Sequence, residues 1–243
     1  YSVAAIRVAE TFIGVIIAFL VNTFIHPPKY GEKLYHIIDY ATSEFLVWIR
    51  SSLRKNSDFT IMNKDLKWAR VQLARMDYFF ELLQESKLPF TKYKLDEQKQ
   101  LVIYRRMIRT TRAAYGVLLV LHDYENSFFN FPQPMRITIR ERMETLMTGH
   151  EQIMLKFSGR IAPEQVHFFE ANKEERKLLL DNFFKHAREE SNVQDFVHQQ
   201  GYSGIHLMSA ILEYEDELIK FNKAVSNFRQ GNKHYHISQI DDF

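Results

Sequence analysis

The sequence "AETFIGVIIAFLVNTFIHPPKYGEKLYH", residues 9–36, holds the longest uncharged run of the chain and decides how its fold is interpreted. No charged residue occurs from residue 11 to residue 25, and Pro27-Pro28 then separates this run from Lys29. Because proline cannot continue a helix, we expect a helix to end before this pair. A helix over residues 3–25 would be about 34 Å long, which is enough to cross a hydrocarbon core of about 30 Å.

Polar and small residues follow one face of this predicted helix. Arg7 and Glu10 are three residues apart, so they share a face and can form an ion pair. Gly14 and Ala18 continue that face, and Asn22 lies near its edge. Small residues let a neighbouring backbone approach, and polar groups within a membrane face protein or a water-filled path. We therefore expect four residues to face a substrate pathway or a partner helix: Arg7, Glu10, Gly14 and Asn22.

The apolar run has three interpretations: a membrane crossing, a buried helix of a soluble domain, and a signal peptide. The signal peptide is disfavoured because Glu10 interrupts the positive region and no small-residue cleavage site precedes Pro27. Lys29 and Lys33 follow the run closely, as is typical of a cytoplasmic exit from a membrane. We favour the membrane crossing, and the buried helix remains the alternative.

The composition of the 243 residues indicates an all-α protein with a packed core. Hydrophobic residues make up 46% and aromatic residues 14% of the chain, which is too apolar for a disordered one. Gly and Pro are scarce, at 8 and 6 residues, so long helices can form with few interruptions. The 32 basic residues nearly balance the 30 acidic ones, which does not favour nucleic acid as a partner. The absence of cysteine excludes disulfides and Cys-based zinc sites.

The chain after Pro28 has a helical pattern with few breaks. Apolar residues at helical spacing predict helices over residues 30–54, 61–86, 96 to about 129, 136–157, 171–191 and 206–228. Short connections between long helices are typical of an up-and-down bundle. We therefore expect a transmembrane helix over residues 1–26, a cytoplasmic helical bundle over residues 27–230, and a flexible tail over residues 231–243.

A basic stretch on the third helix of this bundle is a candidate binding surface. Arg105, Arg109 and Arg112 lie at positions i, i+4 and i+7, which places them on one helix face. Such a face binds anionic lipid headgroups, a carboxylate substrate or nucleic acid. In an antiparallel hairpin, however, acidic residues of the preceding helix would pair with the arginines: Asp77, Glu81 and Glu85. We favour these salt bridges, and we expect no nucleic acid partner because no recognition motif accompanies the arginines.

The sequence predicts no enzyme, metal or cofactor site. Glu164 and His167 form a single ExxH motif, whereas a di-iron bundle needs two such motifs. His234 and His236 form a weak chelating pair in the tail. No GxSxG elbow and no glycine-rich phosphate loop is present. The acidic sequence "LEYEDEL", residues 212–218, is typical of a solvated helix face.

The segment from Arg7 to Asn22, which Pro27-Pro28 follows, resembles a segment of a known protein family. Its sequence "RVAETFIGVIIAFLVN" resembles the final membrane helix of the fusaric acid resistance and aromatic acid exporter superfamily. The resemblance implies a bundle of membrane helices in the inner membrane, followed by a helical cytoplasmic region. It also implies export of small aromatic carboxylates. The implied partners are the lipid bilayer, the remainder of the membrane bundle and further copies of the chain in a homo-oligomer.

On this interpretation, the 243 residues are the C-terminal portion of an exporter, and the cytoplasmic bundle serves assembly or gating. The other membrane helices lie outside the sequence, so these residues alone do not form the transport path. The alternative is a soluble all-α interaction or scaffold module whose first helix is buried in its core.

Overall fold

The computed structural model describes residues 2–20, 30–54, 59–86, 95–162, 172–189, 201–232 and 237. Within these residues the regular secondary structure is entirely α-helical, so the predicted all-α class is confirmed. None of the helices in this part of the chain is long and apolar enough to cross a membrane. The crossing predicted over residues 3–25 extends beyond the described ranges and stays a prediction.

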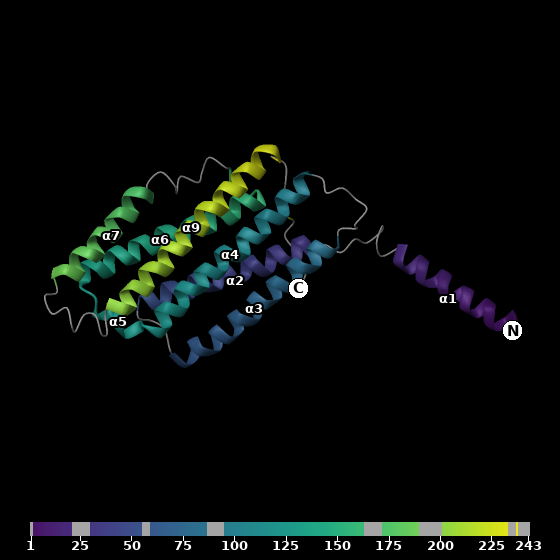
Figure 1. Ribbon diagram of the computed structural model, residues 1–243, viewed down its shortest axis with the longest axis horizontal. Helices are drawn as coiled ribbons and strands as arrows, with labels where there is room; N and C mark the ends of the chain where they lie inside the picture. The colour runs from purple at the N-terminus through teal and green to yellow at the C-terminus, as the bar shows by residue number, and fades with distance from the viewer. Residues whose placement is uncertain are drawn as a thin grey trace.

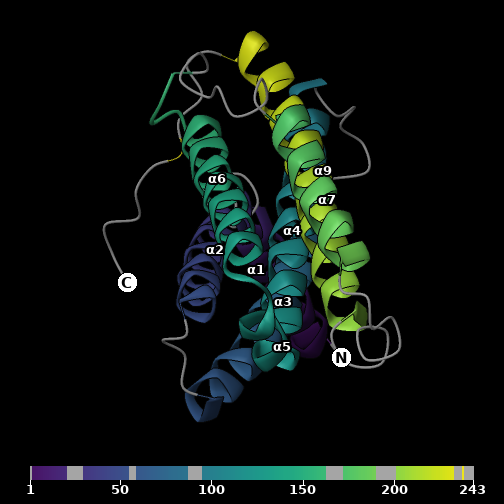
Figure 2. The same cartoon turned by 90° about the vertical axis from the view of Figure 1, so that its left-hand side faces the viewer.

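Of the described helices, six long ones form the body of the molecule, and each runs opposite to the one before it (Figures 1 and 2). They are α2 (Tyr30–Leu53), α3 (Phe59–Glu85), α4 (Leu95–Asp123), α6 (Gln133–Ser158), α7 (Asn172–Glu189) and α9 (Gly201–Gly231). The short α5 (Glu125–Asn130) follows α4, and α1 (Ser2–Leu20) lies apart from the body (Figure 1). The long helices thus form the up-and-down bundle that the sequence predicts.

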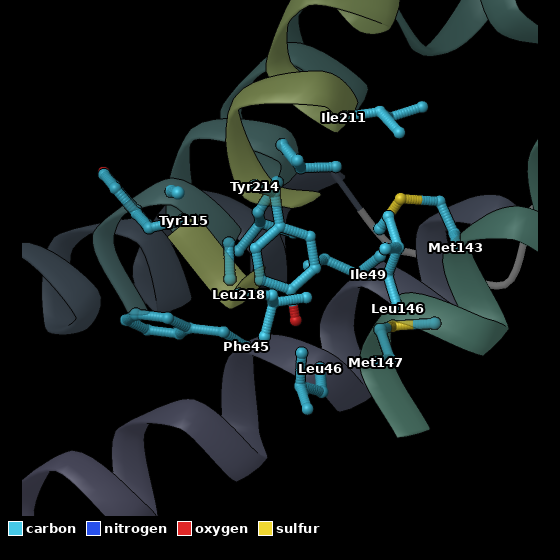
Figure 3. Packing of buried hydrophobic residues seen from close by; sticks show 14 of the residues in the cluster. Phe45, Leu46, Ile49, Tyr115, Met143, Leu146, Met147, Ile211, Tyr214 and Leu218 are labelled. Carbon is cyan, nitrogen blue, oxygen red and sulfur yellow. The ribbon is translucent and has the colours of Figure 1, made fainter. Parts of the chain in front are cut away.

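The core of the bundle surrounds Tyr214 of α9, which has no exposed surface. Figure 3 shows its ring among apolar side chains of α2, α6 and α9. These include Phe45, Leu46, Ile49, Leu146, Met147 and Leu218. Burying a large apolar side chain stabilises a fold by about 1.5–3 kcal/mol, so this cluster supplies much of the driving force for bundle formation.

Two predicted helix boundaries were wrong by five residues or more, and aromatic rings pack at both. The helix predicted from residue 96 to about 129 is divided at Tyr124, whose ring stacks on that of His206, with 5.8 Å between centroids. The last helix begins at Gly201 rather than at residue 206. Gly204 therefore lies in its first turn, where the ring of Phe183 from α7 packs against a backbone without a side chain.

The structure describes residues 231, 232 and 237 of the tail that the sequence predicts to be flexible. Ile237 is buried, and its backbone N–H donates to the carbonyl oxygen of Ser158 at 3.4 Å. This residue therefore packs against the end of α6.

Replacing Gly204 with alanine is expected to destabilise the fold. The added Cβ would lie 2.9 Å from Cε2 of Phe183 and 3.0 Å from Cζ of Phe131, which is closer than carbon atoms normally approach. Overpacking costs about 1–3 kcal/mol, and the higher helix propensity of alanine offsets up to about 1 kcal/mol of this loss. Urea unfolding followed by circular dichroism should therefore give a lower midpoint for Gly204→Ala than for the parent protein.

Gly116→Ala in α4 is the matched control, because no atom lies within 4 Å of a Cβ added there. This change is expected to stabilise the protein by up to about 1 kcal/mol, since alanine loses less backbone entropy on folding. The two midpoints should move in opposite directions. A rise of similar size for both variants would contradict the close contact at Gly204.

Candidate functional site

Helix α1 lies apart from the bundle (Figure 1), and its described apolar side chains are exposed. The large apolar side chains of α1 that the structure describes are 53–67% exposed: Ile6, Val8, Phe12, Ile13, Val15, Ile16 and Ile17. Apolar surface of this extent typically marks a place where a protein meets a partner or a membrane. We therefore treat α1 as the first part of the candidate site.

Three of the four pathway residues predicted from the sequence lie on the exposed surface of α1. Arg7 and Glu10 are both exposed, and no ion pair between them occurs among the described residues. A Cβ added at Gly14 would meet no atom within 4 Å, so the helix surface there is open to a close neighbour. Asn22 lies outside the described residues.

The antiparallel hairpin of α3 and α4 places the predicted arginines beside acidic and aromatic residues. Nη2 of Arg112 donates to both carboxylate oxygens of Asp77, at 2.9 and 2.8 Å, which confirms the predicted salt bridge for this arginine. The guanidinium of Arg105 lies 5.7 Å from the ring centroid of Phe80, in a cation–π contact. Arg105 and Arg109 form no ion pair with Glu81 or Glu85 among the described residues, so this part of the salt-bridge prediction was wrong. Both arginines are exposed, so their guanidinium groups are accessible to an anion.

Sequence reasoning missed a buried ion pair between α6 and α9. Nη2 of Arg142 lies 2.8 Å from Oε1 of Glu215, and their side chains are only 3% and 1% exposed. Nη1 of Arg142 also donates to Glu175 of α7, whose side chain is 40% exposed. The prediction that residues 212–218 form a solvated face was therefore wrong for Tyr214, Glu215 and Leu218, which face the bundle interior.

A buried histidine and tyrosine form the next polar contact along α6 and α9. Nδ1 of His150 lies 2.9 Å from the hydroxyl oxygen of Tyr214, within hydrogen-bond distance, and neither residue has exposed surface. Burial lowers the pKa of His150 to about 3 and raises the pKa of Tyr214 well above its usual value. Both side chains are therefore neutral at pH 7.

A lysine continues the polar contacts toward the end of α6. Nζ of Lys156 donates to Oγ of Ser226 at 2.7 Å and to Oδ1 of Asn222 at 3.3 Å. Together with Arg142 and His150, this lysine forms what we call the α6–α9 polar seam. Buried polar partners of this kind favour the contact between these helix faces, because separating a pair inside the bundle leaves a buried charge or hydrogen-bonding group without that partner.

One sequence signal could have revealed part of the polar seam. His150 lies in line with Leu146 and Ile153, at the three- and four-residue spacing of the buried α6 stripe. A titratable residue at a core position predicts a buried polar partner. The same spacing marks Glu215, which lies four residues after Ile211 and three before Leu218 on the buried stripe of α9.

The described residues hold no group of three or more His, Asp and Glu side chains placed to bind a metal ion. The histidine motifs that the sequence offers lie outside the described ranges: Glu164, His167, His234 and His236. The described part of the candidate site therefore consists of an exposed apolar helix, an exposed basic face and a buried seam of polar contacts. This arrangement suits binding and assembly.

The chain is similar to the UPF0421 protein YgaE of Bacillus subtilis (strain 168), with 27% identity over 226 residues. The alignment covers 93% of this chain and 62% of YgaE, so the chain spans about three fifths of that protein's length. No protein-family model matches the chain, and no solved structure matches it. The similarity to YgaE therefore points to a longer relative whose name assigns no activity.

Proposed function

We propose that the chain is the C-terminal portion of an inner-membrane exporter of small aromatic carboxylates. In this proposal α1 lies in the bilayer against other membrane helices, and the bundle from α2 to α9 lies in the cytoplasm. The exposed apolar surface of α1 carries the proposal. The bundle already contains its own core around Tyr214, so α1 needs a separate environment to cover its side chains.

The energetics of α1 favour burial outside the bundle. Full burial of a side chain such as Phe12 or Ile16 stabilises a structure by about 1.5–3 kcal/mol. Among the described side chains of α1, seven large apolar ones are each at least 53% exposed. Lipid and neighbouring apolar helices both provide this burial. Lys29 and Lys33, which follow α1 in sequence, support a cytoplasmic position for the bundle.

The polar face of α1 supports contact with other helices. Gly14 leaves room for a close backbone approach, and Arg7 and Glu10 avoid lipid when they face protein or an aqueous path. The resemblance of this segment to the aromatic acid exporters suggests the substrate class. YgaE also extends beyond the aligned region, which is consistent with further helices in the complete protein.

Replacing Arg7 or Glu10 with glutamine is expected to impair export without reducing the amount of protein. A charge that faces the pathway contributes to binding or translocation, so we expect efflux of labelled benzoate to fall at least about tenfold, equivalent to about 1.4 kcal/mol. Efflux should be measured in cells that express the complete protein from its own gene, with its abundance checked by immunoblot.

Glu141→Gln is the matched control, because Glu141 is an exposed carboxylate on the bundle surface. This variant should export benzoate at the parent rate. Parent-level efflux in Arg7→Gln and Glu10→Gln would remove both residues from the pathway. Deletion of the gene with no change in efflux or in resistance to aromatic acids would overturn the proposed substrate class.

A further inference from the structure

Helix α3 lies at one edge of the bundle (Figures 1 and 2). From residue 64 to residue 85 it carries a stripe of exposed residues. The stripe contains Lys64, Lys67, Val71, Ala74, Tyr78, Glu81 and Glu85, and all seven residues are exposed. Their spacing alternates between three and four residues, which keeps them on one helix face. We call this face the α3 stripe.

The order of residues in the α3 stripe is self-complementary about Ala74. Val71 and Tyr78 flank Ala74 and are each 57% exposed, although both are large and apolar or aromatic. Two lysines lie at the N-terminal end of the stripe, and two glutamates lie at its C-terminal end. Reading the stripe from either end therefore gives two charges of one sign, three uncharged residues and two charges of the other sign.

We propose that the α3 stripe is the contact surface of a homodimer in which two copies of α3 pack antiparallel about a two-fold axis at Ala74. In this register Val71 of each copy lies against Tyr78 of the other. Lys67 lies opposite Glu81, and Lys64 lies opposite Glu85. The same patch serves both subunits, as a two-fold symmetric interface requires.

The charge order of α3 is unfavourable for the isolated helix, which supports a partner of opposite charge order. Helices are stabilised by acidic residues near the N-terminus and basic residues near the C-terminus. The first turn of α3 holds no acidic residue and its last turn holds no basic residue. The lysines and the glutamates of the stripe also place like charges three or four residues apart, which is unfavourable in a helix.

The four charged residues at the ends of the α3 stripe are available for contacts between subunits. Among the ion pairs of the described residues, none involves Lys64, Lys67, Glu81 or Glu85. An antiparallel copy would bring an opposite charge to each of them. Charge complementarity of this kind determines which surfaces meet and in which register.

Arg75 is a positively charged residue that lies beside the proposed two-fold axis. It follows Ala74, so it would approach its own symmetry mate. Its Nη1 donates to Oε1 of Gln72 at 3.2 Å, which holds the guanidinium against its own helix. The apolar contact at the centre can therefore form beside it.

Single cysteines provide a direct test, because the chain contains no cysteine of its own. Ala74→Cys is introduced into the complete protein, in which any cysteine outside these residues is replaced by serine. The variant is then treated with a short bismaleimide in mild detergent. A dimer should form in high yield, since the two copies of residue 74 meet at the axis. Thr148→Cys, at an exposed position of α6, is the control and should cross-link poorly.

The same method tests the antiparallel register. Val71→Cys alone and Tyr78→Cys alone should cross-link weakly, and a mixture of the two variants should cross-link strongly. Efficient cross-linking of each variant alone would indicate parallel helices and overturn the proposal. An Ala74→Cys yield no higher than that of Thr148→Cys would also overturn it.

Charge reversal gives an independent measurement. Lys67→Glu should weaken the dimer at least about tenfold in sedimentation analysis at low salt. Both contacts between residue 67 and Glu81 in the dimer would then place two negative charges opposite each other. The double variant with Lys67→Glu and Glu81→Lys should restore the dimer, since two-fold symmetry restores both pairs at once. A double variant as weak as the single one would contradict the proposed pairing.

Discussion

Arg142→Ala is expected to lower the free energy of unfolding by about 3–5 kcal/mol, because removing one partner leaves a buried charge uncompensated. Glu215, which lies 2.8 Å from Arg142 and is 1% exposed, would keep its carboxylate in the bundle interior without that guanidinium. Glu175 would also lose the contact that links α7 to α6. Urea unfolding of the complete protein in mild detergent, followed by circular dichroism, measures this loss.

Two further variants distinguish the loss of the buried ion pair from the loss of a charge at the surface. Arg112→Ala removes the salt bridge to Asp77, whose two side chains are 49% and 53% exposed, and should cost no more than about 1 kcal/mol. Replacing both Arg142 and Glu215 with apolar residues, methionine and leucine, should recover most of the stability that Arg142→Ala loses. Equal losses for Arg142→Ala and Arg112→Ala would contradict the buried character of the pair.

Acidification is expected to destabilise the bundle through His150. Burial lowers the pKa of His150 to about 3 in the folded protein, from 6.5 for an unperturbed histidine. Between these values the unfolded chain binds a proton that the folded protein does not. The stability associated with neutral His150 is therefore fully present above pH 6.5 and falls as the pH drops toward 3, by up to about 1.4 kcal/mol per pH unit.

The matched variant replaces His150 with leucine and Tyr214 with phenylalanine, which removes both hydrogen-bonding partners together. Every other titratable group is the same in the two proteins, so the difference between their stability-versus-pH slopes reports His150. Unfolding free energies measured between pH 4 and 6.5 should fall more steeply for the parent protein, by up to about 1.4 kcal/mol per unit. Parallel curves would show that His150 does not remain neutral in the folded state.

The apolar patterning of the sequence predicts the all-α class and the bundle well. Long helices with a repeating apolar stripe leave little choice of secondary structure, and scarce Gly and Pro interrupt them at few places. The errors lie where packing between segments that are distant in sequence determines a helix boundary. The break at Tyr124 involves stacking on His206, which is far away in sequence, and local propensity carries no information about it.

Only part of the candidate site could be predicted from the sequence, because its contacts differ in how far apart their residues lie along the chain. The salt bridge between Arg112 and Asp77 follows from regular spacing on two consecutive helices, so the sequence predicts it. Arg142 and its partner Glu215 lie on α6 and α9, which two connections separate along the chain. Helical periodicity places both residues on apolar stripes, but it does not tell which residues of two helices far apart in sequence meet.

The placement of α1 in a bilayer is the central claim of the proposed function. A cysteine at residue 16, within the exposed apolar surface, tests it directly when the complete protein is kept in native membranes. We predict that Ile16→Cys does not react with a membrane-impermeant maleimide until detergent is added, whereas Thr148→Cys on the bundle reacts at once in inside-out vesicles. Equally rapid labelling of both positions without detergent would contradict the claim.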